Sequence, residues 1–445
     1  MKLDKITIRN FRGFIEERSF DFDSKMNVVL GDNTSGKTTL LHAVQIALGA
    51  YFQALNLIPG GKYFSRNFQS NDHVRVYSGA SKSFLPALEK PSIEVQAHVL
   101  QHTYNLMKGT HDQHGKSISW RRIGNKISYR TCGELMDEVS HMSTCRRNAD
   151  TTGINSILPL MISFSSARLE KNYNGAQKTK VRQTREEKAY KCALNDLVDF
   201  KEAFDWIYRY EKSLERGQEF ECTDLAFKKA LLTAIPALKE IHIDHKNKEL
   251  FARLQMPETD KVEWLTYDMM SDGFKAMINI VSEIGYRCIA LNGFLGAEAI
   301  SQTPGVVLID EIDLFLHPKW QRVVLQHLQQ AFPQMQFIVT THSPFIVQSV
   351  ESHNVITLDG IQGYNDPNKR SIEEIVVSEM NLDTPRSAKY VKMVNLAERY
   401  YQLVSLDLEN GVEAQEVKQE LDDMESEFSD DPAYVALLKA ERRSR

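Results

Sequence analysis

Near the start of the chain, thirteen residues read Met26-Asn27-Val28-Val29-Leu30-Gly31-Asp32-Asn33-Thr34-Ser35-Gly36-Lys37-Thr38. They begin as an apolar run of the kind that forms a buried strand and continue as a turn rich in glycine, asparagine and serine. The following residues, 38–44, have the apolar pattern of a buried helix. The turn has the spacing of a phosphate-binding loop, and the strand before it and the helix after it are the context that such a loop requires. We therefore predict a strand, a phosphate loop and a helix.

Each part of this loop has a chemical reason. The glycines let the backbone wrap so that its N–H groups face phosphate oxygens, and the start of the helix adds positive potential. Lys37 is expected to reach the β- and γ-phosphates, and the Thr38 hydroxyl is expected to ligate Mg²⁺. The predicted nucleotide-binding residues of the loop are Asn33, Thr34, Ser35, Gly36, Lys37, Thr38 and Thr39.

A second apolar run, residues 306–309, ends in two carboxylates, Asp310 and Glu311. The carboxyl ends of strands in α/β sheets are where ligands bind. We expect Asp310 to hold the Mg²⁺ shell and Glu311, one residue further on, to act as the general base for the attacking water. Solvated acids at a strand end are the ordinary alternative, and the phosphate loop elsewhere in the chain favours the catalytic interpretation.

A third apolar run is followed by Thr340-Thr341-His342-Ser343. A lone histidine is more often structural than catalytic. Neighbouring parallel strands deliver their ends to one crevice, however, and this strand follows the acidic pair. We therefore predict that His342 hydrogen-bonds the γ-phosphate, and we group it with Glu311 and Lys37 as candidate catalytic residues.

The remaining sequence divides into an N-terminal part with strand-like alternation and a C-terminal part in which helices and strands alternate. Strand-like alternation marks residues 2–10, 17–23 and 93–100, and residues 118–122 and 126–130 are predicted to form a hairpin across Gly124-Asn125. Residues 186–216 are predicted as one helix, and after Tyr267 helices and strands alternate as in a parallel sheet. The predicted segments are 1–170 with the phosphate loop and an antiparallel sheet, 171–240 as a helical insertion, 241–362 as the second part of the α/β unit, and 363–445 as a helical C-terminal region.

Composition restricts the class of protein. The chain has 445 residues, a net charge of −5 and ordinary apolar and charged contents, all typical of a globular protein. Its opening is unlike a secretory signal, and no apolar run is long enough for a membrane-spanning helix, so we expect a cytoplasmic protein with no membrane partner. Five widely spaced cysteines without a Cys-x-x-Cys pair indicate reduced thiols and no zinc hook.

Taken together, these motifs resemble the ABC-type ATPase heads of the SMC, RecF and OLD group. The resemblance also rests on an opening motif, residues 8–14, on the degenerate signature of residues 270–273, and on Leu316-His317-Pro318-Lys319-Trp320-Gln321 after the acidic pair. It implies an ABC-type P-loop fold, in which a mixed β-sheet lobe joins a parallel-sheet, RecA-like lobe. It also implies ATP as the nucleotide, a binding role for Arg12, and a head-to-head dimer in which Ser271 and Gly273 complete the ATP site of the opposite subunit.

Three departures from the family pattern narrow the function. The signature lacks the second glycine and the glutamine of transporter subunits, which disfavours a transporter ATPase. No glutamine loop is clear, and Gln69 and Asp72 are its weak candidates. OLD-type proteins continue into a nuclease domain, whereas the residues after His342 are too few and too helical for one. We therefore expect an ATPase with no nuclease centre of its own.

The length and the helical tail are most similar to those of stand-alone bacterial defence ATPases of the Septu type, which work beside a separate HNH nuclease, sometimes within a retron. The implied partners are a second copy of the chain or a higher oligomer, an HNH-type nuclease, and DNA or a retron RNA–DNA and reverse-transcriptase complex. A RecF-like DNA-maintenance ATPase is the alternative. The apolar helical stripe Tyr390, Val394, Ala397, Tyr401 and Val404 would either pack on the chain's own core or dock the nuclease, and the basic run of residues 171–188 would either contact nucleic acid or be a solvated loop.

Overall fold

The computed structural model describes the chain except for residues 56–65, 79–81, 106–109, 168–183, 196–200, 217–221, 245–248, 256–260, 359–365, 385, 407 and 426–445. It forms two compact units, Met1–Asn381 and Leu382–Arg445. The basic run predicted to contact nucleic acid lies mostly outside the described residues. No helix in the described part of the chain is long and apolar enough to cross a membrane.

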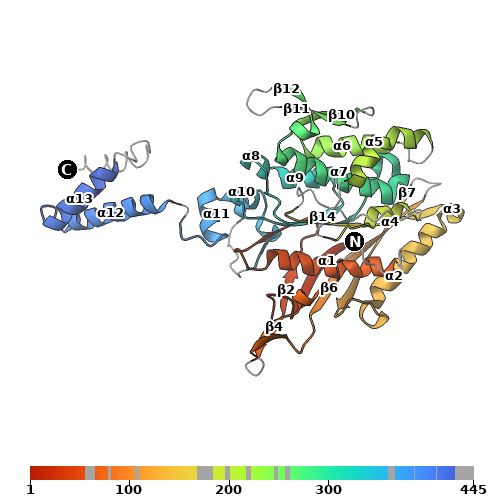
Figure 1. Cartoon of the computed structure of the whole chain (residues 1–445), viewed down its shortest axis with the longest axis horizontal. Coiled ribbons are helices and arrows are strands. Elements are labelled where there is room, and N and C mark those ends of the chain that lie inside the picture. Colours follow the sequence, from red (N-terminus) through yellow and green to blue (C-terminus); the bar gives the residue numbers. More distant parts are fainter. Residues whose placement is uncertain are drawn as a thin grey trace. The chain divides into compact units, whose positions relative to one another are not determined.

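A five-stranded parallel sheet forms the centre of the larger unit (Figure 1). Its strands, in spatial order, are β15 (Val355–Thr357), β3 (Met26–Leu30), β14 (Met335–Thr340), β13 (Gly305–Ile309) and β9 (Leu160–Phe164). Every residue of β3, β9, β13 and β14 is buried, as expected for parallel strands that are covered on both faces. Because β14 lies between β3 and β13, the phosphate loop, the acidic pair and His342 all follow adjacent strands.

Two long helices cover opposite faces of this sheet (Figure 1). Helix α1 (Lys37–Ala54) starts at the phosphate loop and is buried along almost its whole length, which is typical of a helix enclosed between two layers. Helix α7 (Asp272–Asn292) starts at the signature and is likewise largely buried. The predicted α/β fold is confirmed, and each of these helices begins at a predicted motif.

The second layer is an antiparallel sheet, which lies on the other side of α1. It contains β1 (Lys2–Arg9), β2 (Arg18–Asp21), β6 (Ser92–Asn105), β7 (Thr110–Arg122) and the short β8 (Ile154–Ser156), flanked by α2 (Tyr129–Arg147) and α3 (Ala149–Thr152). The indole N–H of Trp120 in β7 donates to the Ala47 carbonyl of α1 over 3.0 Å and joins the layers. A separate hairpin, β4 (Arg75–Ser78) and β5 (Ser83–Pro86), leaves this lobe.

The predicted hairpin across Gly124-Asn125 is wrong. Strand β7 pairs with β6 along all of its length, and residues from Tyr129 onward form helix α2 instead of a strand. The Asn125 side chain exchanges hydrogen bonds with the backbone of Phe68, at 2.7 Å and 3.2 Å. This long-range pairing, rather than a two-residue turn, sets the course of the chain here.

Most of the helical insertion and a small sheet lie beyond α7, as seen from the central sheet (Figure 1). The insertion holds α4 (Arg185–Tyr190), α5 (Lys201–Glu215) and α6 (Thr223–Ala234), and the antiparallel strands are β10 (Leu238–Asp244), β11 (Glu249–Gln255) and β12 (Val262–Thr266). The predicted single helix 186–216 is therefore wrong. The Ala193 carbonyl accepts from Ser163 N of β9, and the buried Arg287 guanidinium donates to the carbonyls of Ala189 and Lys191. These contacts use backbone groups that a continuous helix would need.

The remaining helices of the larger unit are short: α8 (Pro318–Gln321), α9 (Val324–Ala331), α10 (Pro344–Val347) and α11 (Ile372–Ser378). Short segments of 3-10 helix span Ser70–Asp72, Tyr267–Met269, Gly293–Glu298, Ser352–Asn354 and Pro367–Lys369. In the smaller unit, α12 (Ala388–Ser405) packs on α13 (Val412–Glu425) around Met393, Ala397 and Leu421. Tyr390, Val394 and Tyr401 pack on this cluster, so most of the predicted stripe lies in the unit's own core.

Candidate nucleotide-binding site

The phosphate loop is shaped by unusual backbone and by one close contact. Thr34 and Gly36 have left-handed φ values of 79° and 105°. The left-handed backbone favours glycine at position 36, and a Cβ atom there would also make a tight contact, 3.1 Å, with the ring of Phe14. Phe14 belongs to the opening motif, which therefore packs against the phosphate loop.

Lys37 is buried within the loop that precedes it. Its ammonium group donates to the carbonyls of Gly31, at 2.6 Å, and Asp32, at 2.9 Å. The hydroxyl of Ser35 is also buried and has no hydrogen-bond partner among the described residues. A buried hydroxyl without a partner costs about 1–3 kcal/mol. A phosphate oxygen would remove this penalty, so the loop fits an anionic ligand.

The first turn of α1 and the ends of two strands bring oxygen atoms together beside the loop. The Thr38 hydroxyl donates to one carboxylate oxygen of Asp310 over 3.1 Å, and the Thr340 hydroxyl donates to the other over 2.5 Å. Asp310 is only 7% exposed. Hydroxyl and carboxylate oxygens are the ligands that Mg²⁺ prefers, so the donor set of Thr38 and Asp310 fits this ion.

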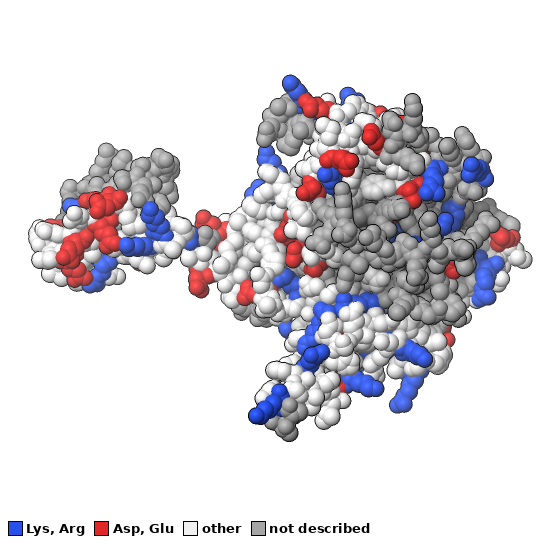
Figure 2. All heavy atoms as spheres, in the orientation of Figure 1, with Lys and Arg blue, Asp and Glu red and all other residues white. Residues whose placement is uncertain are grey.

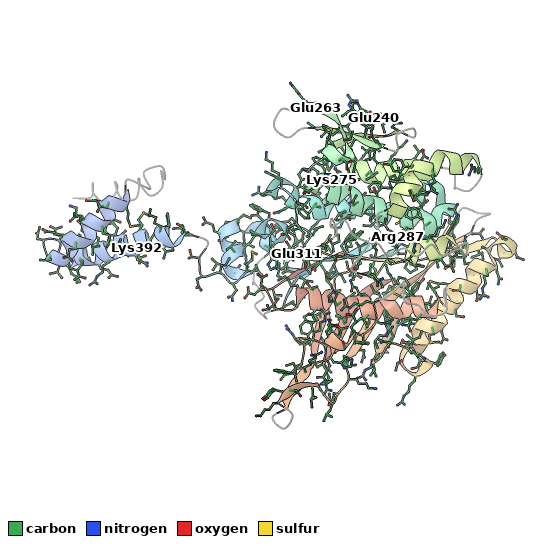
Figure 3. All side chains as sticks on the ribbon, in the orientation of Figure 1. Glu240, Glu263, Lys275, Arg287, Glu311 and Lys392 are labelled. Atoms are coloured by element: carbon green, nitrogen blue, oxygen red, sulfur yellow. The ribbon has the colours of Figure 1, made fainter. Side chains whose placement is uncertain are left out.

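Glu311 follows Asp310 directly, just after the carboxyl end of β13, and is half-buried. Figure 3 labels this residue. Its φ of 50° is left-handed, which is uncommon for a residue with a side chain. Its backbone N–H donates to the Thr340 hydroxyl over 2.8 Å. Thr340, which the sequence did not single out, therefore orients both members of the acidic pair; its place at the end of the next strand was the available signal.

His342 is exposed at the end of the neighbouring strand. Asp313, in the segment after Glu311, accepts from the Thr341 hydroxyl at 2.5 Å and from the His342 backbone N–H at 3.4 Å. The structure thus joins the backbone of His342 to the segment that follows Glu311, as the parallel order of β13 and β14 predicts.

Arg12 is tied to other parts of the chain. Its guanidinium donates to Asp72 at 2.7 Å and lies 2.7 Å from Nδ1 of His42, on α1. Asp72 is fully buried and also pairs with Arg66 at 3.2 Å. Of the two weak glutamine-loop candidates, Asp72 thus anchors two arginines, while Gln69 is exposed and caps the turn Ser70–Asp72.

The signature residues begin α7. Ser271 is the N-cap, is exposed, and makes no capping hydrogen bond with its side chain. Gly273 is buried, and a Cβ atom there would lie 2.6 Å from the Phe315 carbonyl oxygen, so the close approach of two backbones requires glycine. The sequence predicted a role for Gly273 at the opposite subunit's nucleotide, and the structure adds a packing role within its own chain.

A phosphate loop, a strand-end acidic pair and a histidine on adjacent parallel strands, backed by an antiparallel sheet across α1, define an ABC-type P-loop ATPase head. Comparison with protein families agrees with this class. A family model described as an AAA domain matches residues 5–256, which is more than half of the chain. The chain belongs to this AAA-domain family. A second AAA-domain model, whose description names the AbiEii toxin of a type IV toxin–antitoxin system, matches residues 181–348.

Several curated relatives of this chain are named as retron ATPases or Septu proteins. It is 21% identical to "Retron Vc95 probable ATPase" of Vibrio cholerae serotype O1 biovar El Tor, over 80% of this chain and 73% of that one. It is 23% identical to "Retron Ec83 probable ATPase" of Escherichia coli, over 82% and 73%. It is 34% identical to "Septu protein PtuA" of Bacillus thuringiensis, over 32% and 38%. These relatives support an ABC-type ATPase of the SMC, RecF and OLD group.

Two further similarities are more limited. A stretch of 84 residues is 38% identical to the DNA replication and repair protein RecF of Psychromonas ingrahamii, over 19% of each chain. Among solved structures, an SMC head bound to the C-terminal winged-helix domain of ScpA covers 80% of this chain and 94% of its own, with 16% identity and a TM-score of 0.40.

Proposed function

We propose that two copies of this ATPase close head to head over two Mg-ATP and that this closure regulates a partner effector nuclease in anti-phage defence. The observation that carries the proposal is the convergence of Thr38, Asp310 and Thr340 beside a loop that encloses the Lys37 ammonium. The relatives named as retron and Septu proteins support the defence context.

Within this proposal each side chain has one task. Lys37 and the loop N–H groups bind the β- and γ-phosphates, and Thr38 and Asp310 hold Mg²⁺, which when bound neutralises developing charge on the phosphate oxygens. Glu311 accepts a proton from the attacking water. His342 donates a hydrogen bond to the γ-phosphate, and its loop is held in place through Asp313.

The proposed dimer uses the exposed start of α7. The Ser271 hydroxyl does not cap the helix, so the first N–H groups of this 21-residue helix have no hydrogen bond from the N-cap side chain. The N-terminus of a long helix favours an anion. In the closed dimer this end would face the γ-phosphate bound by the opposite subunit, as the family resemblance implies.

The effector nuclease is proposed to be a separate HNH-type protein, and the ATPase itself cuts nothing. The smaller unit, residues 382–445, is proposed as its docking region because it has a core distinct from that of the ATPase body. A retron RNA–DNA and reverse-transcriptase complex is a further proposed partner.

The first test compares two substitutions at the site. Lys37→Ala should abolish ATP binding in a fluorescent-nucleotide titration. Glu311→Gln should bind ATP as the native chain does, but its rate of hydrolysis should be lower by about 100-fold or more. Native mass should then show Glu311→Gln as a dimer with two ATP. Lys25→Ala, an exposed lysine before the opposite end of β3, is the matched control and should behave as the native chain. Equal loss of binding in both site variants would contradict these roles.

A RecF-like function in DNA maintenance is the second candidate, supported by the 84-residue similarity to RecF. The two candidates separate when the Glu311→Gln protein is purified from its native host with ATP and Mg²⁺. A stoichiometric HNH-type nuclease would support the defence proposal. A dimer that carries duplex DNA and no protein partner would support the RecF-like function instead.

A further inference from the structure

The segment between Glu311 and α8 is a strained loop that has to be held in place. Residues 311–317 contain two left-handed residues that are not glycine, Glu311 with φ 50° and Phe315 with φ 69°. Such residues persist only where the surrounding structure over-determines them. Side chains outside the loop fix it in this conformation.

One amide side chain, that of Gln321, ties the loop at several points. Its Nε2 donates to the carbonyl oxygens of Leu316, at 2.8 Å, and Asp313, at 3.3 Å. Its Oε1 accepts from the Ser343 hydroxyl at 2.6 Å. A single planar group thus connects the loop after β13 to the residue directly after His342.

A second tie runs in parallel with the first. The Asp313 carboxylate accepts from the Thr341 hydroxyl at 2.5 Å and from the His342 N–H at 3.4 Å. The loop that carries Glu311 and the loop that carries His342 are therefore joined on both sides of the histidine. A shift of either loop has to move the other.

The same loop also touches the signature helix. The close approach of Gly273 to the Phe315 carbonyl places the first turn of α7 directly on the loop. One residue further along α7, the ring of Phe274 packs edge-on against Trp320, with centroids 4.4 Å apart. Trp320 is the neighbour of Gln321 in α8, so the signature, the loop and the amide form one continuous set of contacts.

We propose that Gln321 is a positioning residue that couples the signature end of α7 to Glu311 and His342. Engagement of Ser271 by a second copy's nucleotide presses on the Phe315 carbonyl, and Gln321 holds the loop rigid so that the displacement reaches both strand ends. ATP binding itself, through Lys37 and Thr38, does not depend on this amide. The inference rests on the proposed head-to-head dimer and on the proposed roles of Glu311 and His342.

The experiment measures ATP affinity and turnover separately in the full-length chain. Gln321→Ala should lower kcat by about tenfold or more while the dissociation constant for ATP stays within about twofold, because misplacement of reacting groups affects turnover and not phosphate binding. Gln321→Glu should be similarly slow, since a carboxylate can accept from Ser343 but cannot donate to the two carbonyls. Gln330→Ala, an exposed glutamine on α9, is the matched control and should match the native chain.

Variants of Ser343 test whether its hydrogen bond to Gln321 affects turnover. Ser343→Ala should lower kcat, and Ser343→Thr, which keeps the hydroxyl, should restore it. The losses in kcat from Gln321→Ala and Ser343→Ala should be less than additive in the double variant, because both substitutions remove the hydrogen bond between Ser343 and Gln321. Native turnover in Gln321→Ala, or additive losses in the pair, would overturn the inference. If the native chain binds ATP but Glu311→Gln hydrolyses it normally, the proposed catalytic role fails first, and the two failures are distinct.

Discussion

At the scale of single residues, strained backbone gathers around the nucleotide site. Arg12, Thr34, Glu311 and Phe315 are all left-handed without being glycine, and each belongs to a predicted motif or to the loop next to one. Such conformations cost of order 1–3 kcal/mol each. Contacts from distant parts of the sequence hold two of them: Asp72 and His42 bind Arg12, and Thr340 binds Glu311.

Gly273→Ala tests the closest of these contacts. The new Cβ would lie 2.6 Å from a backbone oxygen that cannot rotate away, so we expect a loss of about 1–3 kcal/mol in the free energy of unfolding, together with slower hydrolysis. Thermal melting and steady-state turnover measure both effects. Gly124→Ala, where no heavy atom lies within 4 Å, should change neither. A native melting temperature for Gly273→Ala would show that the two backbones are further apart.

Thiol labelling tests the burial of the cysteines. Burial raises the pKa of the Cys288 thiol, and Cys132 and Cys192 are also buried, whereas Cys222 is exposed and Cys145 is partly exposed. Because the thiolate is the reactive form, a thiol reagent should modify Cys222 first and Cys145 next in the native chain, and all five only after denaturation. Rapid labelling of Cys288 in the native chain would contradict the packing of α7.

At the scale of elements, Asp72 connects three parts of the lobe. Its carboxylate joins the loop after β1, through Arg12, to the segment between α1 and β4, through Arg66. Arg12 in turn reaches His42 on α1. The helix that begins at the phosphate loop is thereby fastened to the antiparallel sheet. The opening motif thus has a structural role in addition to any contact with the nucleotide.

Asp72→Ala should be strongly destabilising, because removal of one partner from a buried ion pair costs about 3–5 kcal/mol. We also expect weaker ATP binding, since α1 carries Lys37 and Thr38. Denaturant unfolding and nucleotide titration measure the two effects. Asp21→Ala is the control: its ion pair with Lys5 spans 3.8 Å at the surface, and its loss should cost less than about 1 kcal/mol. Equal stability of the two variants would contradict the anchoring role of Asp72.

At the scale of the whole molecule, each of the two units has an apolar core of its own. The smaller unit pairs α12 with α13 through surface ion pairs, Lys392 with Glu420 at 2.5 Å and Arg399 with Glu413 at 2.6 Å, over a small apolar cluster. Figure 2 shows acidic and basic side chains together on this unit, and Figure 3 labels Lys392. The larger unit contains all of the predicted nucleotide-binding residues.

Removal of residues 382–445 should therefore leave ATP affinity within about twofold of the native value, because no predicted nucleotide ligand is lost and the main core is intact. If the smaller unit docks the nuclease, the shortened chain should no longer retain that partner in a pull-down. Lys392→Ala, which breaks only an exposed ion pair, is the control and should retain it. Loss of ATP binding in the shortened chain would contradict the division into independent units.

The contiguous motifs were predictable because their chemistry is local. A phosphate loop uses consecutive backbone N–H groups at one helix start, and apolar runs followed by polar residues identify strands whose ends meet in a crevice. The strands that carry the phosphate loop, the acidic pair and His342 were confirmed on this basis. The helix 186–216 was wrong because the distant Arg287 binds backbone carbonyls that a continuous helix would use. The hairpin at Gly124-Asn125 was wrong because β7 pairs with β6 and the Asn125 side chain binds the backbone of the distant Phe68.

The amino-acid order was sufficient for the class of fold and for the identity of the phosphate and acidic motifs. It could not show which residues hold those motifs in place. Thr38 meets Asp310 across 272 positions, Arg12 meets Asp72 across 60, and Gln321 meets Ser343 across 22. Hydrogen bonds at such separations depend on how strands and helices pack, and no local periodicity encodes them. For this reason the connections from the signature helix to the catalytic loops emerge only when the whole chain is folded.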